Sequence, residues 1–325
     1  MKLSILIPAF NVSEFIMRCL SSVASQINPE NTEIIVLNDG STDDTEALLR
    51  TFAAPGFRYL TTPNRGEAEA RNRLLEECKG DYFWFVDADD FINTKIIDQI
   101  LILITESAAD IIYLSYRSVF DKKNGNNHVF FDDFDSGLQL IRNRLFCNTI
   151  WQKVIRKELV SKNNLKFHQL KTGTDFVFSF QLLSLAQRIR TVSEISYYYC
   201  YNTNSISNQG GKEHLERLAE DTLKGLDLIL EFKKSFSEDE NRILDVWVNY
   251  FLSGFIFSLI RYRDYSLIQL FYYIAELRKR GLYPLQSSGQ NIKIKGFIHL
   301  SNTTLGAQLM KNIFSKDYRS WIKQN

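Results

Sequence analysis

Three aspartates follow a short apolar run near position 85. The run, Tyr82–Val86, has the length and composition of a strand buried on both faces. Asp87, Asp89 and Asp90 follow it, at the strand end where ligands bind in open α/β sheets. Carboxylates this close repel one another, and their oxygens suit a hard divalent cation, Mn²⁺ or Mg²⁺, that substrate phosphates complete. The alternative is a solvated acidic turn in which Asp89, Asp90 or Asn93 caps the following helix.

The bulk composition is that of an ordinary globular protein. Of the 325 residues 45% are hydrophobic and 24% charged, and the net charge of +1 predicts no nucleic-acid partner. The length favours two domains, or one domain with an appendage. The four cysteines are scattered without a C-x-x-C pair, which argues against a zinc site or a disulfide framework. A reducing cytoplasm is the expected compartment, and the apolar run before Pro8 is too short for a signal peptide.

Short strands alternate with helices over the first ninety residues and must position the acidic cluster. The expected strands are Leu3–Ile7, Thr32–Leu37, Phe57–Leu60 and Tyr82–Val86. This alternation predicts parallel βαβ units, and therefore a Rossmann-like α/β half. Neither G-x-G-x-x-G nor a P-loop follows the first strand, so a metal at the acids would have to neutralise phosphate, helped by Arg65 or Arg71.

Beyond Asp90 the pattern is mixed. Strands are expected at Asp110–Tyr116, at Val129–Phe131 after a polar turn, Asp121–Asn127, and at Arg190–Tyr201. Helices are expected at Ile96–Ile104, Ser136–Arg144, Arg156–Asn163 and Phe176–Leu185. The stretch Asn202–Lys212 is rich in Asn, Ser and Gly and marks a boundary between domains 1–210 and 211–325.

In the last third of the chain the sequence predicts only helices. They are expected at Glu213–Lys234, Glu238–Arg261, Ser266–Arg280 and Leu305–Lys323. The apolar stretch Trp247–Ile260 is shorter than the roughly 20 residues that span a bilayer, so a buried helix is expected. Basic residues interleaved with aromatic and apolar ones follow: Lys293, Lys295, Lys311, Lys316, Arg319 and Lys323. They suit peripheral contact with an anionic membrane, or alternatively form the solvated face of a capping helix.

Four segments together resemble the family 2 glycosyltransferases with the GT-A fold, inverting enzymes that use nucleotide sugars. They are Ser4–Asn11, Glu33–Asp43, Asn64–Gly66 with Ala70–Asn72, and Gly80–Asp90. Each motif is modestly specific, whereas their order and spacing are highly specific. The resemblance is strong over residues 1–95, and thinner to about 210. It implies an α/β GT-A fold with a Rossmann-like nucleotide-binding half and a mixed central sheet, followed by a helical C-terminal region.

The resemblance also assigns site residues. It implies that a nucleotide pocket is lined by Pro8, Ala9, Phe10 and Asn11. It further implies that Asp39 bonds the uracil ring, for which an Asp-Gly turn is the alternative. Asn64, Gly66 and Arg71 would lie beside the base and phosphates, although Arg71 could instead form a helix-surface ion pair with Glu67. Asp87, followed by Ala88, would bind the ribose or the metal's water shell, and Asp89 would be the metal ligand of the D-x-D motif.

The general base is expected before the apolar helix Phe176–Leu185. An inverting transfer needs one carboxylate to take the proton from the acceptor hydroxyl. Family members often carry Glu-Asp at this place, and here the pair reads Thr174-Asp175. Asp175 is the expected base, and a helix cap is the alternative. Trp151 could stack on a sugar, although a buried tryptophan is more common.

These expectations converge on a bacterial-type glycosyltransferase of cell-surface polysaccharide synthesis. It would move a sugar from a nucleotide donor, most simply a UDP-sugar, to a hydroxyl of a glycan or lipid-linked oligosaccharide. The helical part would shape the acceptor site, form a homodimer or rest on the inner face of the plasma membrane. A nucleotidyltransferase would need a Gly-rich basic loop after the first strand, which is missing. A non-catalytic nucleotide-sugar-binding scaffold or sensor remains the alternative, since Thr174 departs from the family pattern.

Overall fold

The structure is a computed structural model, and it describes residues 2–120, 123–170, 173–201, 212–262, 265–286 and 292–314. The chain divides into two compact units. The first comprises Met1–Leu140, Cys147–Gln169 and Thr174–Asn202, and the second Ile141–Phe146, Leu170–Gly173 and Thr203–Asn325. The predicted boundary at 210 lies outside the described residues.

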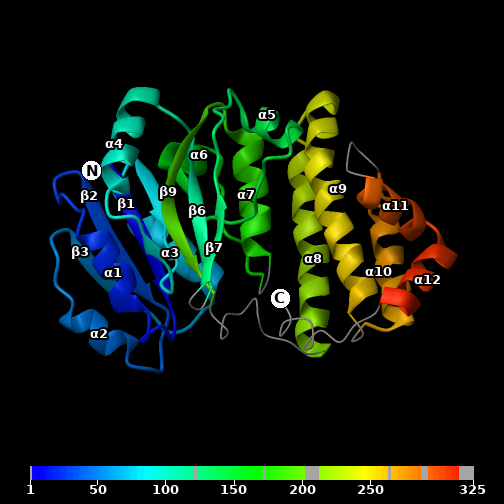
Figure 1. The fold of residues 1–325 in the computed structure, drawn as a ribbon, viewed down its shortest axis with the longest axis horizontal. Coiled ribbons are helices and arrows are strands. Elements are labelled where there is room, and N and C mark those ends of the chain that lie inside the picture. Colours follow the sequence, from blue (N-terminus) through cyan, green and yellow to red (C-terminus); the bar gives the residue numbers. More distant parts are fainter. Residues whose placement is uncertain are drawn as a thin grey trace. The chain divides into compact units, whose positions relative to one another are not determined.

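The first unit is built on one mixed sheet, which contains nine strands in the part of the chain that is described. Its order is β3-β2-β1-β4-β8-β6-β9-β5, with β7 paired to β6 (Figure 1). The strands are β1 (Leu3–Ala9), β2 (Thr32–Asn38), β3 (Phe57–Thr61), β4 (Tyr82–Phe85), β5 (Phe91–Ile92), β6 (Ile111–Phe120), β7 (Lys123–His128), β8 (Lys153–Arg156) and β9 (Ile189–Cys200). β1 to β4 pair in parallel, which confirms the predicted βαβ units.

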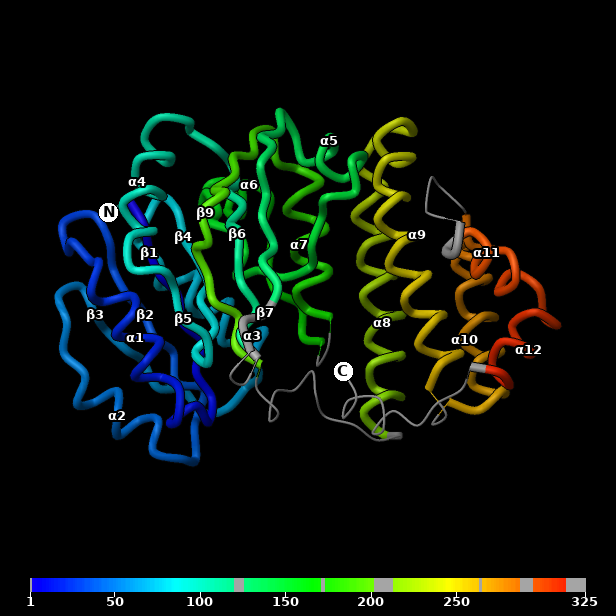
Figure 2. The backbone as a smooth tube through the Cα atoms, viewed as in Figure 1, coloured from blue at the N-terminus to red at the C-terminus, as the bar shows by residue number. Residues whose placement is uncertain are grey.

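Helices cover both faces of this sheet. α1 (Ile16–Ala24) and α4 (Ile96–Ser107) bury their apolar residues in one cluster with Ile5 and Ile7 of β1. α3 (Glu67–Glu77) contacts β1 and β2, and on the same side as Arg71 of α3, Phe167 meets Phe85 of β4 and stacks on Phe178 of α7 (Thr174–Leu185). The short helices are α2 (Thr45–Thr51), α5 (Gly137–Arg142) and α6 (Lys157–Lys162). Figure 2 lets the chain be followed from the blue β1–β3 to the green β9.

Three elements differ from the predictions. Residues 123–128 form β7 on β6 where a turn was predicted, and the predicted strand Val129–Phe131 is wrong. β5 and β8 were not predicted, and the helix expected at Arg156 begins at Lys157. These strands are short or polar, so their pairing partners, and not their own sequences, determine them. The capping alternative for the acids is also wrong, because α4 has Lys95 as N-cap and no side-chain cap.

The described residues of the second unit form five helices. They are α8 (Lys212–Lys233), α9 (Glu238–Arg261), α10 (Leu267–Lys279), α11 (Ile292–Ser301) and α12 (Thr304–Phe314). Two of these helices begin with a capping box: Ser237 with Glu240 caps α9, and Ser266 with Gln269 caps α10. α11 was not predicted. The predicted last helix ended at Lys323, and the residues after Phe314 lie outside the described part.

One expectation about this unit holds in part and another needs correction. α9, expected to be a buried helix, has 24 residues and by length and composition could cross a membrane, and half of its apolar window is buried. The buried core helices of globular proteins pass the same test, and Leu252 and Ile256 are 1% and 0% exposed. Lys311, counted above as part of a basic face, is 5% exposed. Its ammonium donates to the carbonyls of Leu259, at 2.8 Å, and Tyr262, at the end of α9.

Candidate active site

The acidic cluster follows β4, as predicted, and backbone contacts hold its loop. Asp87 N–H donates to the hydroxyl of Tyr197 on β9, at 3.1 Å. The Asp89 carbonyl accepts from the Arg18 guanidinium of α1 at 2.6 Å. Asp90 is 1% exposed and takes no part in an open acidic surface. Contacts from β9 and α1 therefore hold the loop in a defined conformation.

Arg71 of α3 joins the acidic loop to the predicted base. Its side chain is 2% exposed, and it forms ion pairs with Glu67 at 2.6 Å, with Asp87 at 3.6 Å and with Asp175. The guanidinium also lies over the ring of Phe167, 5.4 Å from the centroid. The surface ion pair considered for Arg71 and Glu67 is therefore only part of the arrangement. One buried cation connects three carboxylates that are up to 108 residues apart in sequence, Glu67 to Asp175.

Burial and neighbouring charges shift the pKa values of Arg71 and Asp87 in this cluster. Burial alone would lower the pKa of Arg71, but the carboxylates of Asp175, Glu67 and Asp87 raise it above its ordinary value. Burial raises the pKa of Asp87 to about 7 against the opposing charge of Arg71, with further increases from Asp89, Glu67 and Asp175. Three carboxylates pair with this one guanidinium, so the contacts leave net negative charge when all three are ionised. Additional positive charge at this position would be strongly favoured.

Asp175 lies in the first turn of α7, which begins at Thr174, two residues before the predicted start of this helix. One of its oxygens pairs with Arg71, and the other accepts the N–H of Ile150 at 3.4 Å. The side chain is 28% exposed, so part of the carboxylate is accessible from solvent. A carboxylate that is oriented on one side and open on the other can take a proton from a bound hydroxyl. The capping alternative is not supported, because these two partners lie outside α7.

Hydrogen bonds join the loops after β1 and β2, which are predicted to line the nucleotide pocket. Pro8 and Ala9 end β1, and Phe10 after them is 45% exposed. Asn11, with a φ of 52°, accepts the N–H of Thr42 at 2.8 Å through its side chain, and its own N–H donates to Ser41 at 3.0 Å. The loops after β1 and β2 thus form one rim beside the carboxyl ends of the strands, where a nucleotide is expected.

Asp39 organises the third predicted segment. Its carboxylate oxygens accept the N–H groups of Arg65 and Gly66, both at 2.9 Å, and the residue is 4% exposed. Gly66 then precedes α3 with a φ of 90°. Asn64 lies against Gly40, where an added Cβ would come within 2.7 Å of the Asn64 nitrogen. These contacts account for the Asp-Gly pair structurally, and the predicted uracil contact stays a prediction.

The residues present fit a divalent cation held by few protein groups. Asp87 and Asp89 supply hard oxygen ligands from one loop, and burial, followed by the charges of Asp89, Glu67 and Asp175, raises the pKa of Asp87. Within the described ranges no group of three or more His, Cys, Asp or Glu side chains is arranged as a complete metal site. A cation here would therefore need ligands from a bound phosphate. Ala88, between the two acids, is 4% exposed and packs in the core on the α1 side.

The sequence did not identify two of the residues that support the site. Tyr197 bonds both ends of the acidic loop, and Arg18 holds the Asp89 carbonyl. Neither lies in a sequence motif, because Tyr197 reaches the loop from β9 and Arg18 reaches it from α1. Trp151 is 5% exposed and stacks on Tyr197 and Tyr199, with ring centroids 4.5 and 5.6 Å apart. It is a buried tryptophan and does not present a face for a sugar.

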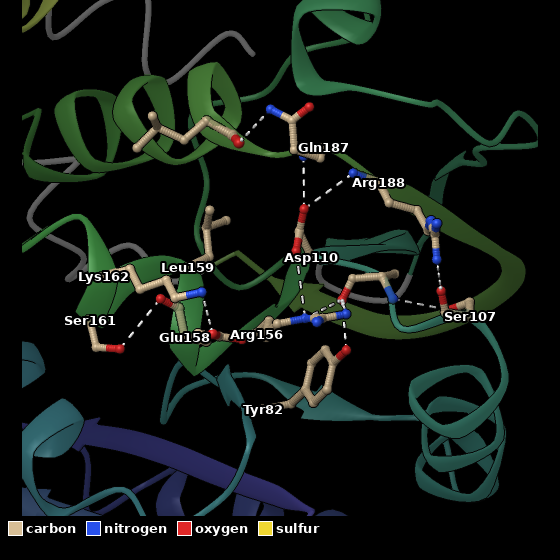
Figure 3. Close-up of polar contacts among 12 residues, drawn as sticks. Tyr82, Ser107, Asp110, Arg156, Glu158, Leu159, Ser161, Lys162, Gln187 and Arg188 are labelled. Atoms are coloured by element: carbon tan, nitrogen blue, oxygen red, sulfur yellow. Dashed lines mark hydrogen bonds and ion pairs between the residues drawn. The ribbon is translucent and has the colours of Figure 1, made fainter.

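A separate cleft of ≈ 490 Å³ lies at the opposite end of β4. Figure 3 shows its surroundings, where the Arg156 guanidinium lies near Tyr82 and Asp110. Tyr82 donates to the Ala109 carbonyl at 2.7 Å, and Arg156 donates to the same oxygen at 3.2 Å. These contacts connect β4, β6 and β8 and explain the residues structurally. The acidic cluster lies at the other end of the strand, so this cleft is not part of the candidate site.

Comparison with known proteins relates the first half of the chain to glycosyltransferases. Residues 4–163 match the family model Glycosyl transferase family 2. Poly(ribitol-phosphate) β-N-acetylglucosaminyltransferase TarS of Staphylococcus aureus is 28% identical over 204 residues, which cover 61% of this chain and 35% of that protein. The uncharacterized glycosyltransferase YibD of Escherichia coli is 29% identical over 229 residues, 65% of each protein. The chain thus spans about a third of TarS and under two thirds of YibD.

Solved structures agree on the fold. The crystal structure of S. aureus TarS 1–349 in complex with UDP-GlcNAc aligns with a TM-score of 0.62 at 20% identity, over 99% of this chain and 92% of that chain. The mannosyltransferase PcManGT from Pyrobaculum calidifontis, in complex with GDP-Man and Mn²⁺, aligns with a TM-score of 0.56 at 14% identity, over 99% and 83%. The predicted GT-A fold is confirmed, and residues 4–163, just under half of the chain, match glycosyl transferase family 2.

Proposed function

We propose that this chain is an inverting, metal-assisted glycosyltransferase that moves a sugar from a UDP-sugar to a hydroxyl of a glycan or lipid-linked acceptor. The observation that carries the proposal is the Arg71 cluster, in which one buried guanidinium joins the acidic loop through Asp87 to the carboxylate of Asp175. A donor bound at the loop and a base beside it are the two parts that a single in-line displacement requires.

The residues would divide the work as follows. Asp175 would accept the proton of the attacking hydroxyl at its solvent-open side, while Arg71 and the Ile150 N–H orient its carboxylate. Asp89, with Asp87, would hold Mn²⁺ or Mg²⁺, and the ion would stabilise the charge on the leaving diphosphate. The rim of Asn11 and Asp39 would hold the nucleoside. Rigid backbone ties at each position favour this arrangement, because they reduce the cost of ordering the site when the donor binds.

The relatives support a UDP-sugar as the donor. TarS is named an N-acetylglucosaminyltransferase and its structure contains UDP-GlcNAc. A Bacillus spizizenii relative, 27% identical, is named a poly(ribitol-phosphate) β-glucosyltransferase. We therefore take UDP-GlcNAc and UDP-glucose as the first donors to test, and a polyol-phosphate or glycan hydroxyl as the first acceptors.

The test is donor turnover by the purified chain with each UDP-sugar, in Mn²⁺ or in EDTA, with and without acceptor. We expect metal-dependent release of UDP that Asp89→Ala and Asp175→Asn each lower by about two orders of magnitude or more. The matched control is Asp98→Asn, because Asp98 is an exposed first-turn acid on α4. UDP-sugar binding without turnover under any condition would favour the non-catalytic scaffold. Asp175→Asn with wild-type turnover would refute the base.

A peripheral position on the cytoplasmic face of the membrane is proposed from α12. Leu305, Leu309 and Ile313 recur every four residues on one side of this helix and are 78%, 54% and 62% exposed. Lys295 on α11 is also exposed. An apolar stripe with neighbouring basic charge suits the surface of an anionic bilayer. Co-flotation with phosphatidylglycerol vesicles, lost in Leu305→Gln/Leu309→Gln, tests the contact. A concentration-dependent dimer that the same change dissociates would instead assign the stripe to a homodimer.

A further inference from the structure

Tyr197 connects the two ends of the acidic loop. Its side chain is fully buried, and its hydroxyl accepts the Asp87 N–H at 3.1 Å and donates to the Asp90 carboxylate at 2.6 Å. The other Asp90 oxygen accepts the N–H of Cys200, also at 2.6 Å. A continuous chain of hydrogen bonds therefore runs from the backbone of Asp87, through Tyr197 and Asp90, to the backbone of β9.

This arrangement gives Asp90 a role different from that of its neighbours. Both of its carboxylate oxygens have protein donors, and the residue is 1% exposed. Asp90 is thus an anchor, and its two oxygens are occupied by protein donors. The residues on either side of Ala88 and Asp89 are both attached to the same tyrosine.

The tyrosine itself is held rigidly. Its ring stacks on Trp151 with centroids 4.5 Å apart and planes 15° apart, and it lies 6.2 Å from the ring of Trp84. Trp84 in turn donates its indole N–H to the Trp151 carbonyl at 2.7 Å. The hydroxyl therefore has a fixed position relative to the carboxyl end of β4. Movement of the acidic loop would break its hydrogen bonds to this fully buried hydroxyl.

We propose that Tyr197 is a positioning residue for the metal-binding loop, and that its hydroxyl sets the divalent-metal affinity of Asp87 and Asp89. The inference rests on the proposed function, since it assigns the loop to a metal. Partners that fix metal ligands without touching the metal commonly change metal affinity by 10- to 100-fold when they are removed. Tyr197 acts here on the backbone of Asp87 and, through Asp90, on the other end of the loop.

The test is the Mn²⁺ affinity of the full chain in the presence of UDP, measured by electron paramagnetic resonance of free Mn²⁺. Tyr197→Phe removes one oxygen and keeps the aromatic stack. We expect its Kd for Mn²⁺ to rise about tenfold or more. The matched control is Tyr198→Phe, which removes a hydroxyl from the next residue of β9 and keeps the stack on Phe91, 4.6 Å away. Its Kd should equal that of the wild type.

Two further measurements distinguish a positioning role of Tyr197 from a purely structural role. UDP binding in EDTA should be unchanged in Tyr197→Phe, and kcat at saturating Mn²⁺ should approach the wild-type value, while the Mn²⁺ concentration for half-maximal rate rises. Asp90→Asn should raise the Kd similarly, and the double variant should be no worse than the stronger single one, because both changes break the same chain of bonds. Additive effects would contradict the connection.

The outcomes distinguish this inference from the proposed function. Wild-type protein that binds Mn²⁺ with UDP, and Tyr197→Phe that binds it equally well, would overturn the inference alone. Equal losses in Tyr197→Phe and Tyr198→Phe would also overturn it, since the effect would then be general to β9. Wild-type protein that binds no metal in the presence of UDP would refute the metal-assisted function and the inference together.

Discussion

Replacing Arg71 by methionine should destabilise the first unit and inactivate the site together. Methionine keeps the length and apolar stem of the side chain but removes the cation that Glu67, Asp87 and Asp175 share. Removing one partner of a fully buried ion pair costs about 3–5 kcal/mol. The three acids are 46%, 28% and 28% exposed, so water screens part of the repulsion that remains. We therefore expect a loss of about 3 kcal/mol, at the lower end of that range.

Thermal and urea unfolding measure this loss directly. A loss of about 3 kcal/mol in a cooperative unit of this size lowers the melting temperature by about 6–12 °C. Added Mn²⁺ with UDP should recover more of the melting temperature in Arg71→Met than in the wild type, because the ion then supplies the missing positive charge. Transferase activity should fall by about 100-fold, since the base loses the group that orients it.

Arg73→Met is the matched control. Arg73 lies on the same helix, is 48% exposed and pairs with Glu76 and Glu77 on the surface. Exposed pairs contribute about 0–1 kcal/mol, so this variant should melt within about 4 °C of the wild type and stay active. Equal melting temperatures for Arg71→Met and Arg73→Met would refute the reasoning, because a buried cation shared by three acids cannot be removed at the cost of a surface pair.

Three further outcomes are expected. Gly40→Ala should destabilise the first unit by about 2 kcal/mol in urea, because φ is +69° and the new Cβ would lie 2.7 Å from the Asn64 nitrogen; an unchanged midpoint would contradict that geometry. Lys311→Met should lower the stability of the helical unit, measured by circular dichroism, by about 2 kcal/mol, because the carbonyls of Leu259 and Tyr262 lose a charged donor; wild-type melting would contradict the burial. UDP at about 100 times its Kd should raise the free energy of unfolding by about 2.7 kcal/mol when Mn²⁺ is present, and EDTA should remove most of this increase. An equal increase in EDTA would contradict the metal's role.

Local sequence patterns were sufficient for the first ninety residues and for most helices. Strands β1 to β4 appear as short apolar runs between turns, and the parallel order follows from the helices between them. The position of Asp87 and Asp89 after β4, and of Asp175 in the first turn of α7, needed no tertiary information. In each case the signal, a hydrophobic period or a turn residue, lies within about a dozen residues of the feature it predicts.

Only the tertiary structure decided which of these residues meet and what each does. The polar strand β7 and the short strands β5 and β8 exist because partners in the sheet complete their hydrogen bonds. Arg71 reaches Asp175 across 104 residues, and Tyr197 reaches Asp87 across 110. Lys311 has the sequence context of an exposed basic helix but is buried against α9. Ion pairs and buried hydrogen bonds depend on distances of a few ångströms between segments far apart in the chain, and only the folded backbone determines those distances.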